Sequence, residues 1–158
     1  MVAMMKNEFL IRKARMADTR TLDAMLTELI GYETRYDSNL DASYQVQDNY
    51  ARLVGEEGCA LLVAEAEGRI LGFLYGFMYQ IPGMFVKPVA LLDALFVLEP
   101  YRGRGIATAL FFAFRRFAAE NGACRIELKV MSRNENALHF YEKLSFQECK
   151  KYMTLDCL

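Results

Sequence analysis

The sequence lacks an excess of charge of either sign. It has 19 lysines and arginines against 20 aspartates and glutamates, which leaves a formal net charge of −1. This balance provides no general electrostatic attraction to nucleic acid or to an anionic membrane surface. The arginine pairs Arg102/Arg104 and Arg115/Arg116 are too few to form a basic stripe. We therefore expect no nucleic-acid partner and no membrane partner.

The sequence also lacks the patterns that bind metal ions or cross membranes. Its four cysteines show no CxxC spacing, and His139 is the only histidine. We interpret the cysteines as reduced thiols and expect no metal site. No apolar run reaches the ~18 residues of a membrane span. The start MVAMMKNEF lacks the long apolar core of a signal peptide, so we expect a cytoplasmic protein.

What the sequence does contain is an apolar composition with two clear periodicities. Hydrophobic residues make up 54% of the 158 positions and no long linker is present, which indicates one domain over residues 1–158. Short or alternating apolar runs predict strands over residues 9–14, 59–66, 69–79, 89–98 and 124–130, and a final strand or hairpin over 146–158. Helical spacing predicts helices from Asp18 or Thr19 to near Gly31, over 46–54, from the turn at Gly105 to Asn121, and over 134–144, with a loop over 32–44. This order predicts a mixed sheet with helices on both faces.

Glycines mark three positions in the β-rich part of the chain. Glu67-Gly68 separates two strand-like runs and predicts a hairpin turn. Gly72 and Gly76 lie inside the second run. A glycine within a strand indicates a bulge or the close approach of another group.

Residues 89–108 combine a buried strand, a glycine-rich turn and the start of a helix. Asp93 is the only polar residue of this strand, as in a strand covered on both faces. Pro100 ends the strand because it has no N–H for a β-ladder. Gly103 and Gly105 then place unpaired N–H groups and the positive end of a helix dipole together. Such a place suits phosphate oxygens.

Two motifs resemble those of the GCN5-related N-acetyltransferases, the GNAT superfamily. Arg102-Gly-Arg-Gly105-Ile-Ala107 fits that family's R/Q-x-x-G-x-G/A signature. Asn134-x-x-Ala137-x-x-x-Tyr141-x-Lys143-x-Ser145-Phe146 resembles its N-x-x-A-x-x-x-Y-x-K-x-G-F element. Ser145 replaces the usual glycine, and Ala107 stands where glycine is common. The resemblance covers nearly the whole chain and is closest to acetyltransferases of small amines.

The resemblance implies a GNAT fold, an α/β (α+β) architecture whose mostly antiparallel sheet of about 6–7 strands is splayed at the coenzyme site. It implies acetyl-CoA (coenzyme A) as cosubstrate. The backbone of Leu95, Phe96 and Val97 is expected to pair with the pantetheine arm, which Asn134 also hydrogen-bonds. The residues expected at the pyrophosphate are Arg102, Gly103, Arg104, Gly105, Ile106, Ala107 and Thr108. Arg102 and Arg104 either assist there or only frame the turn.

The reaction that the resemblance implies is direct transfer of an acetyl group to a primary amine. It needs a neutral amine, a stabilised oxyanion and a proton for the leaving thiolate. Tyr141 is the candidate acid, because the matching tyrosine of the family lies beside the coenzyme sulfur. On spacing alone, a purely structural core aromatic stays an alternative.

Asp93 is the candidate base or amine ligand. A carboxylate is costly to bury without a partner, and residues 93, 95 and 97 are expected to share one face of the strand. It resembles the acidic residue at this place in spermidine/spermine acetyltransferases. The alternative is a structural carboxylate that caps a loop or pairs with an arginine. Glu99 is a weaker base candidate, and His139 is expected at the surface.

The acceptor is expected to contact Tyr32, Glu33, Tyr79 and Asp93. The 32–44 loop would give an acidic, aromatic mouth suited to a cation, or else only a solvated loop. Three functions therefore stay open: an N-acetyltransferase of a small-molecule amine, an acetyltransferase of protein N termini or lysines, and a non-catalytic acyl-CoA sensor. Tyr141 together with Asp93 favours the enzymes. A homodimer formed through residues 152–158 is a further open expectation.

Overall fold

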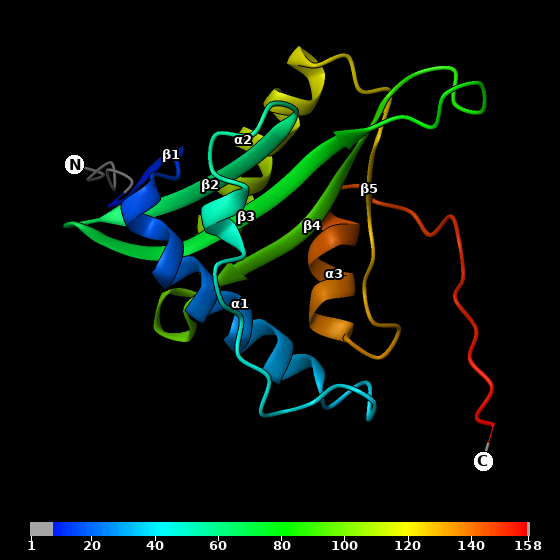
Figure 1. The fold of residues 1–158 in the computed structure, drawn as a ribbon, viewed down its shortest axis with the longest axis horizontal. Helices are drawn as coiled ribbons and strands as arrows, with labels where there is room; N and C mark the ends of the chain where they lie inside the picture. The colour runs from blue at the N-terminus through cyan, green and yellow to red at the C-terminus, as the bar shows by residue number, and fades with distance from the viewer. Residues whose placement is uncertain (1–7, 158) are drawn as a thin grey trace, which may run out of the picture.

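A five-stranded sheet in the order β1-β2-β3-β4-β5 forms the centre of the chain (Figure 1). The computed structural model describes residues 8–157. The strands are β1 (Leu10–Lys13), β2 (Cys59–Ala66), β3 (Arg69–Tyr79), β4 (Val89–Val97) and β5 (Ile126–Leu128). The helices are α1 (Thr19–Glu33), α2 (Ile106–Glu120) and α3 (Glu135–Lys143), with single 3-10 turns at Met16–Asp18, Tyr50–Arg52 and Glu99–Tyr101. Among the described helices, none is long and apolar enough to cross a membrane.

The predicted mixed, mostly antiparallel sheet is confirmed. Neighbouring strands from β1 to β4 are antiparallel, whereas β4 and β5 are parallel because the chain returns through α2. The number of strands is smaller than expected. Within the described residues, the predicted strand or hairpin after Phe146 is wrong, since residues 147–157 form no strand, and residue 158 lies outside the described range.

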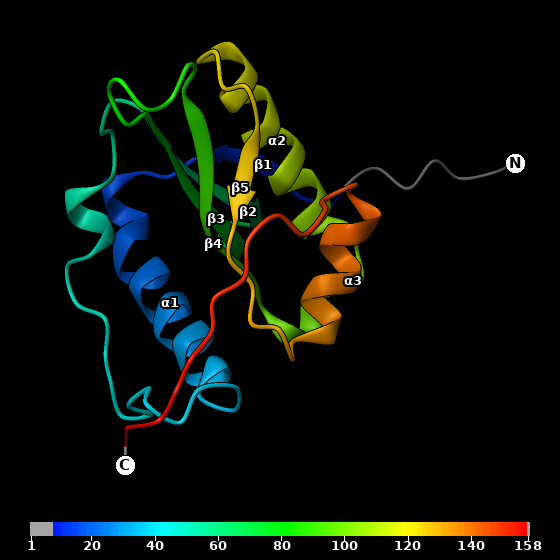
Figure 2. The same cartoon turned by 90° about the vertical axis from the view of Figure 1, so that its right-hand side faces the viewer.

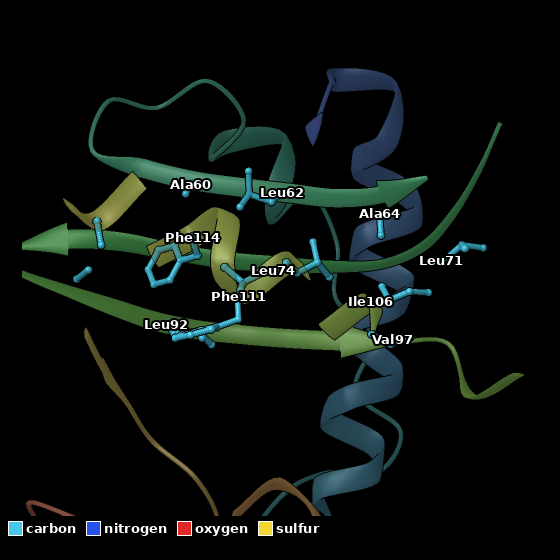
Figure 3. Close-up of a cluster of buried hydrophobic side chains, with 13 residues drawn as sticks. Ala60, Leu62, Ala64, Leu71, Leu74, Leu92, Val97, Ile106, Phe111 and Phe114 are labelled. Atoms are coloured by element: carbon cyan, nitrogen blue, oxygen red, sulfur yellow. The ribbon is translucent and has the colours of Figure 1, made fainter. Parts of the chain in front are cut away.

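The two faces of the sheet carry separate hydrophobic clusters. Leu62 and Leu74 face α2 and pack with Leu110 and Phe114, as Figure 3 shows in part. Val63 lies in the cluster on the opposite face, which α1 covers. This alternation follows from the two-residue period of a strand. The prediction of helices on both faces is therefore confirmed, and both faces of the sheet are unavailable to solvent over most of their area.

Three element boundaries differ from the prediction. The helix expected over 46–54 is reduced to the 3-10 turn at Tyr50–Arg52, and α1 continues past Gly31 to Glu33. Asp18 stands at the N-cap of α1 without capping it, because its carboxylate instead accepts from the Arg12 guanidinium at 2.8 Å and the Arg15 amide at 2.7 Å. The strand expected over 124–130 is limited to β5, since it loses its neighbour beyond Leu128.

The glycines of β3 lie where other groups approach closely. Glu67 and Gly68 have φ angles of 50° and 75° and form the predicted hairpin turn. The register shifts near Gly72 and again at Gly76. A Cβ at Gly72 would lie 2.6 Å from the Phe96 carbonyl oxygen, and one at Gly76 would lie 2.4 Å from the Phe114 ring. Both expected causes, bulges and close approach, are therefore confirmed.

Replacing Gly72 by alanine should destabilise the fold. Its added methyl must displace the β4 backbone, so the free energy of unfolding should fall by about 2 kcal/mol. Gly31→Ala is the matched control, because its Cβ meets nothing within 4 Å. That variant should gain about 0.5–1 kcal/mol from the lower entropy of the unfolded chain. Urea unfolding measures both, and a Gly72→Ala variant as stable as the parent would contradict the close approach.

Candidate active site

The strands β4 and β5 pair over only three residues and then separate. Ala90, Leu91 and Leu92 face Ile126, Glu127 and Leu128, and beyond this point β4 keeps only β3 as a described neighbour. The predicted backbone segment at Leu95–Val97 therefore lies on an open edge of β4. Unpaired backbone donors and acceptors on such an edge are able to bind an extended polar chain. This geometry fits the expected pantetheine arm.

The glycine-rich turn lies at the end of the same strand. Gly103 and Gly105 have φ angles of 74° and 80°, and a Cβ at either position would meet nothing within 4 Å. Gly105 is the N-cap of α2, and its carbonyl oxygen accepts the first hydrogen bond of the helix, from the Ala109 amide. The amides of Ile106, Ala107 and Thr108 therefore have no intrahelical partners, and the positive end of the helix dipole lies at this turn. The turn fits the expected pyrophosphate.

The two arginines of the turn pack against neighbouring residues. Arg102 donates from Nε to the Val97 carbonyl at 2.8 Å, and its guanidinium lies 5.6 Å from the centre of the Phe96 ring. The Arg104 guanidinium lies 5.5 Å from the Tyr101 ring centre. Of the two roles left open by the sequence, these contacts favour framing of the turn. The Val97 carbonyl also already accepts one hydrogen bond.

Asp93 is the extra residue of a bulge in β4. Tyr75 pairs with Ala94 and Gly76 pairs with Leu92, so Asp93 has no opposite residue. Because the bulge reverses the alternation, Leu95 and Val97 pack on the α2 side while Ala94 lies in the α1-side cluster. The expectation that residues 93, 95 and 97 share a face assumed an unbroken alternation and is wrong. Asp93 is exposed, although its strand is otherwise mostly buried.

Charges from three elements act on one another around Asp93. Surrounding protein atoms partly desolvate its carboxylate and raise its pKa, and the positive charge of Lys129 opposes this. Burial and the charge of Asp93 raise the pKa of Glu33, at the last turn of α1. Burial and the charge of Glu33 raise the pKa of Tyr141 on α3 to about 12. Figure 2 shows α1 and α3 on either side of the β4–β5 edge. Glu33 thus lies close enough to interact electrostatically with both Asp93 and Tyr141.

Tyr141 is held by aromatic neighbours and is half-buried. Its ring makes edge-to-face contacts with Phe140 and Phe146, with centroids 5.2 Å and 5.5 Å apart. The turn that carries Phe146 back to it includes Ser145 at a φ of 69°, in the left-handed region where the resemblance expects glycine. The residue therefore combines a packed ring with a position beside the charged groups.

Tyr50 and Lys129 are the residues of this region that the sequence did not single out for a role. The Tyr50 hydroxyl is buried without a hydrogen-bond partner among the described residues, and its ring packs edge-to-face on Tyr75 at 5.6 Å. Burial and then the charge of Asp93 raise its pKa. The amide of Tyr50 donates to Asp23 at 3.1 Å, which ties it to α1. No local pattern reveals this environment, because α1, β3 and β4 together create it.

The remaining predicted contacts have partners within the chain. The Tyr32 hydroxyl lies 3.2 Å from that of Tyr36, and the Tyr79 hydroxyl donates to Glu127 at 3.0 Å. Asn134 caps α3, where its Oδ1 accepts from the Ala137 amide at 3.2 Å. Tyr79 and Tyr75 both lie in β3, four residues apart. The contact of Tyr79 with an acceptor stays a prediction. The contact of Asn134 with the pantetheine arm also stays a prediction.

A contact far apart in sequence closes one side of this site. Arg133, in the connection from β5 to α3, donates to the Tyr36 carbonyl at 2.9 Å. It therefore joins the segment after α1 to the start of α3. His139 is exposed on α3, and Glu99 is exposed at the end of β4, as expected.

Known proteins with similar sequences are acetyltransferases. The sequence model of the acetyltransferase (GNAT) family matches residues 22–146. An uncharacterized N-acetyltransferase, MJ1207 of Methanocaldococcus jannaschii, is 31% identical over 113 residues, which cover 68% of this chain and 50% of that protein. The thialysine N-epsilon-acetyltransferase of Mus musculus is 28% identical over 147 residues, covering 87% of this chain and 84% of that protein.

Solved structures share the fold. A variant of the BH1408 protein from Bacillus halodurans superposes with a TM-score of 0.84 at 24% identity, covering 94% of this chain and 99% of that one. At this identity the likeness concerns the fold alone. The chain spans about half the length of the first curated relatives that it matches.

Proposed function

The chain belongs to the acetyltransferase (GNAT) family, and on this basis we propose that residues 1–158 form one N-acetyltransferase domain acting on the primary amine of a small molecule. The observation that carries this proposal is the convergence of Asp93, Glu33 and Tyr141 beside the open edge of β4. The name of the mouse relative, which specifies an amino-acid side-chain amine, supports a small acceptor.

Acetyl-CoA, when bound, supplies an acetyl thioester at this site. The backbone edge of Leu95 and Phe96 would hold its extended arm, and the amides of residues 103–108 would hold its phosphates. This assignment uses the side of β4 that β5 leaves unpaired and the amides at the start of α2. It also separates the tasks along one strand, with the phosphates at its end and the chemistry near its bulge.

The two carboxylates would bind and deprotonate the acceptor. An amine arrives as a cation at neutral pH and must lose a proton before it attacks. Glu33 and Asp93 attract the cation, and a raised pKa brings Asp93 closer to the working pH of a general base. The exposed position of Asp93 in the bulge allows an amine to reach it.

Tyr141 would provide the proton for the departing thiolate. With a pKa of about 12, the phenol stays protonated at neutral pH. The ammonium first loses one proton to Asp93. As the carbon–nitrogen bond forms and the carbon–sulfur bond breaks, Tyr141 gives its proton to sulfur and regains one from the acylated nitrogen, so that one proton per turnover passes from Asp93 to solvent. The packing of its ring against Phe140 and Phe146 keeps the phenol hydroxyl oriented during this transfer.

A panel of acceptors tests the proposed function. With acetyl-CoA and equal concentrations of polyamines, basic amino acids, aminoglycosides and short peptides, released thiol should appear with a small amine. The charged site favours acceptors that are cationic. Preference for peptides would indicate a protein acetyltransferase instead. Binding of acetyl-CoA without turnover of any amine would indicate a sensor.

Replacing Tyr141 by phenylalanine should lower kcat by about 10²-fold, the usual scale for losing a general acid. The dissociation constant for acetyl-CoA should change less than about twofold, because the ring packing is kept. Tyr152→Phe is the control, since Tyr152 is 82% exposed and outside the site. Steady-state kinetics and calorimetry measure the two quantities. An unchanged kcat removes Tyr141 from the mechanism.

The pH dependence of kcat/KM identifies the base. If Asp93 must be ionised, activity is lost as the pH falls through its raised pKa, so the acidic limb lies above the ordinary aspartate value of ~3.9. Asp93→Asn should lower activity and move or abolish this limb. Glu99→Gln is the comparison, because Glu99 is the competing carboxylate. An acidic limb that responds to Glu99→Gln and not to Asp93→Asn assigns the role to Glu99.

A further inference from the structure

Two arginines from segments far apart in the sequence meet just past the end of α1. Figures 1 and 2 both show the end of α1 close to the connection from β5 to α3. Arg133, in that connection, donates to the Tyr36 carbonyl at 2.9 Å. The hydrogen bond with Tyr32 raises the pKa of Tyr36, and the positive charges of Arg35 and Arg133 both oppose this. Two guanidinium groups therefore lie near one phenol hydroxyl.

Both guanidinium groups are held in place and remain open to a ligand. Arg35 donates from Nε to the Tyr32 carbonyl at 3.0 Å, and its Cζ lies 3.7 Å from the centre of the Tyr32 ring. Arg35 and Arg133 are exposed, and no carboxylate in the part of the chain that the structure describes pairs with either. Because a guanidinium carries five N–H donors, most donors of each arginine stay available.

The hydroxyl groups of Tyr32 and Tyr36 add a further donor. They lie 3.2 Å apart, and their rings pack edge to face with centroids 5.8 Å apart. In such a pair one hydroxyl donates to the other, so the second keeps its hydrogen for another acceptor. Two guanidinium groups and a phenol hydrogen suit an anion with several oxygen atoms, such as a carboxylate or a phosphate.

The place of this cluster relative to Glu33 favours a carboxylate on the acceptor. The Tyr36 amide donates to the Glu33 carbonyl at 2.8 Å, so the cluster lies about one helical turn, ~5 Å, beyond Glu33. The charge of Asp93 acts on Glu33, and these two carboxylates are the proposed site of the amine. The acceptor site thus has a negative part for an ammonium and, one turn away, a positive part for a carboxylate of the same molecule.

We propose that Arg35, Arg133 and the Tyr32–Tyr36 pair form a carboxylate-binding subsite, and that the acceptor is an amino acid acetylated on its side-chain amine. This inference rests on the proposed function, because it takes the amine to lie at Glu33 and Asp93. Binding at both ends orients the amine for attack on the thioester. A diamine instead places a second positive charge beside the arginines, which repel it.

Matched acceptors test the subsite on the full chain. Cadaverine is lysine without its carboxylate, putrescine is ornithine without its carboxylate, and ε-aminocaproate is lysine without its α-amine. At saturating acetyl-CoA, kcat/KM for lysine or ornithine should exceed that for the corresponding diamine by about tenfold or more, the scale of a hydrogen bond between charged groups. Where lysine is accepted, ε-aminocaproate should be accepted too. An enzyme that prefers the diamines, or that acetylates other amines but neither amino acid, overturns the proposal.

Replacing the arginines should change the two kinds of acceptor in opposite directions. Arg133→Gln should lower kcat/KM for the amino acid by about tenfold, chiefly through KM, and raise it for the diamine, because a repelling charge is lost. Arg35→Gln should act in the same direction. Arg116→Gln is the matched control, since it removes one charge at an exposed position on α2, across the sheet from α1, and should change neither.

Two results of these variants would contradict the subsite. An equal fall for the amino acid and the diamine would mean that Arg133 only joins the two segments. A higher KM for acetyl-CoA with every acceptor would mean that the arginines bind a phosphate of the coenzyme.

Binding without turnover separates this inference from the proposed function. ε-Aminocaproate is titrated into the full chain without acetyl-CoA and followed by nuclear magnetic resonance. Its dissociation constant should rise about tenfold in Arg133→Gln and stay unchanged in Arg116→Gln. That result, in a chain that acetylates no amine, would keep the subsite and overturn the proposed function. Equal binding by the parent and Arg133→Gln overturns the subsite, whether or not the chain is an enzyme.

Discussion

The separation of β4 from β5 after three paired residues is the constraint on which the rest of this molecule depends. Two parallel strands that stay paired have no free backbone groups between them. Here the pairing ends at Leu92, and the bulge at Asp93 follows immediately. β4 remains in place because β3 pairs with it on the other side, with the glycines at 72 and 76 allowing close contact. The fold thus keeps this edge of β4 open between β4 and β5.

The electrostatics of the site follow from that opening. Glu33, Asp93 and Tyr141 come from α1, β4 and α3, and the charge of Asp93 acts on Glu33 while that of Glu33 acts on Tyr141. Desolvation raises the pKa values of both carboxylates, and at Glu33 the negative charge of Asp93 adds to this effect. This arrangement is unfavourable for the protein alone. It is suited to a cationic guest, which relieves the repulsion on binding.

The outer edge of β5 has the opposite character. An uncovered strand edge beside an exposed apolar segment, here residues 147–157, invites unwanted pairing with other chains. Charged side chains near this edge, among them Glu127, Lys129 and Lys150, discourage such pairing. The open edge of β4 and the small extent of β5 have the same origin, because the two strands pair over only three residues.

The sequence by itself determined the strands β2, β3 and β4, the helix α2 and the glycine turn before it. These depend on near neighbours: residue periodicity, the φ angles that glycine permits, and the missing amide of Pro100. Only the tertiary structure decided the bulge that turns Asp93 away from the face of Leu95 and Val97, the early end of β5, the buried hydroxyl of Tyr50 and the absence of a strand over residues 147–157. Each of these depends on contacts between residues far apart in the chain. Local patterns carry no record of those contacts, because the same residues fit more than one pairing.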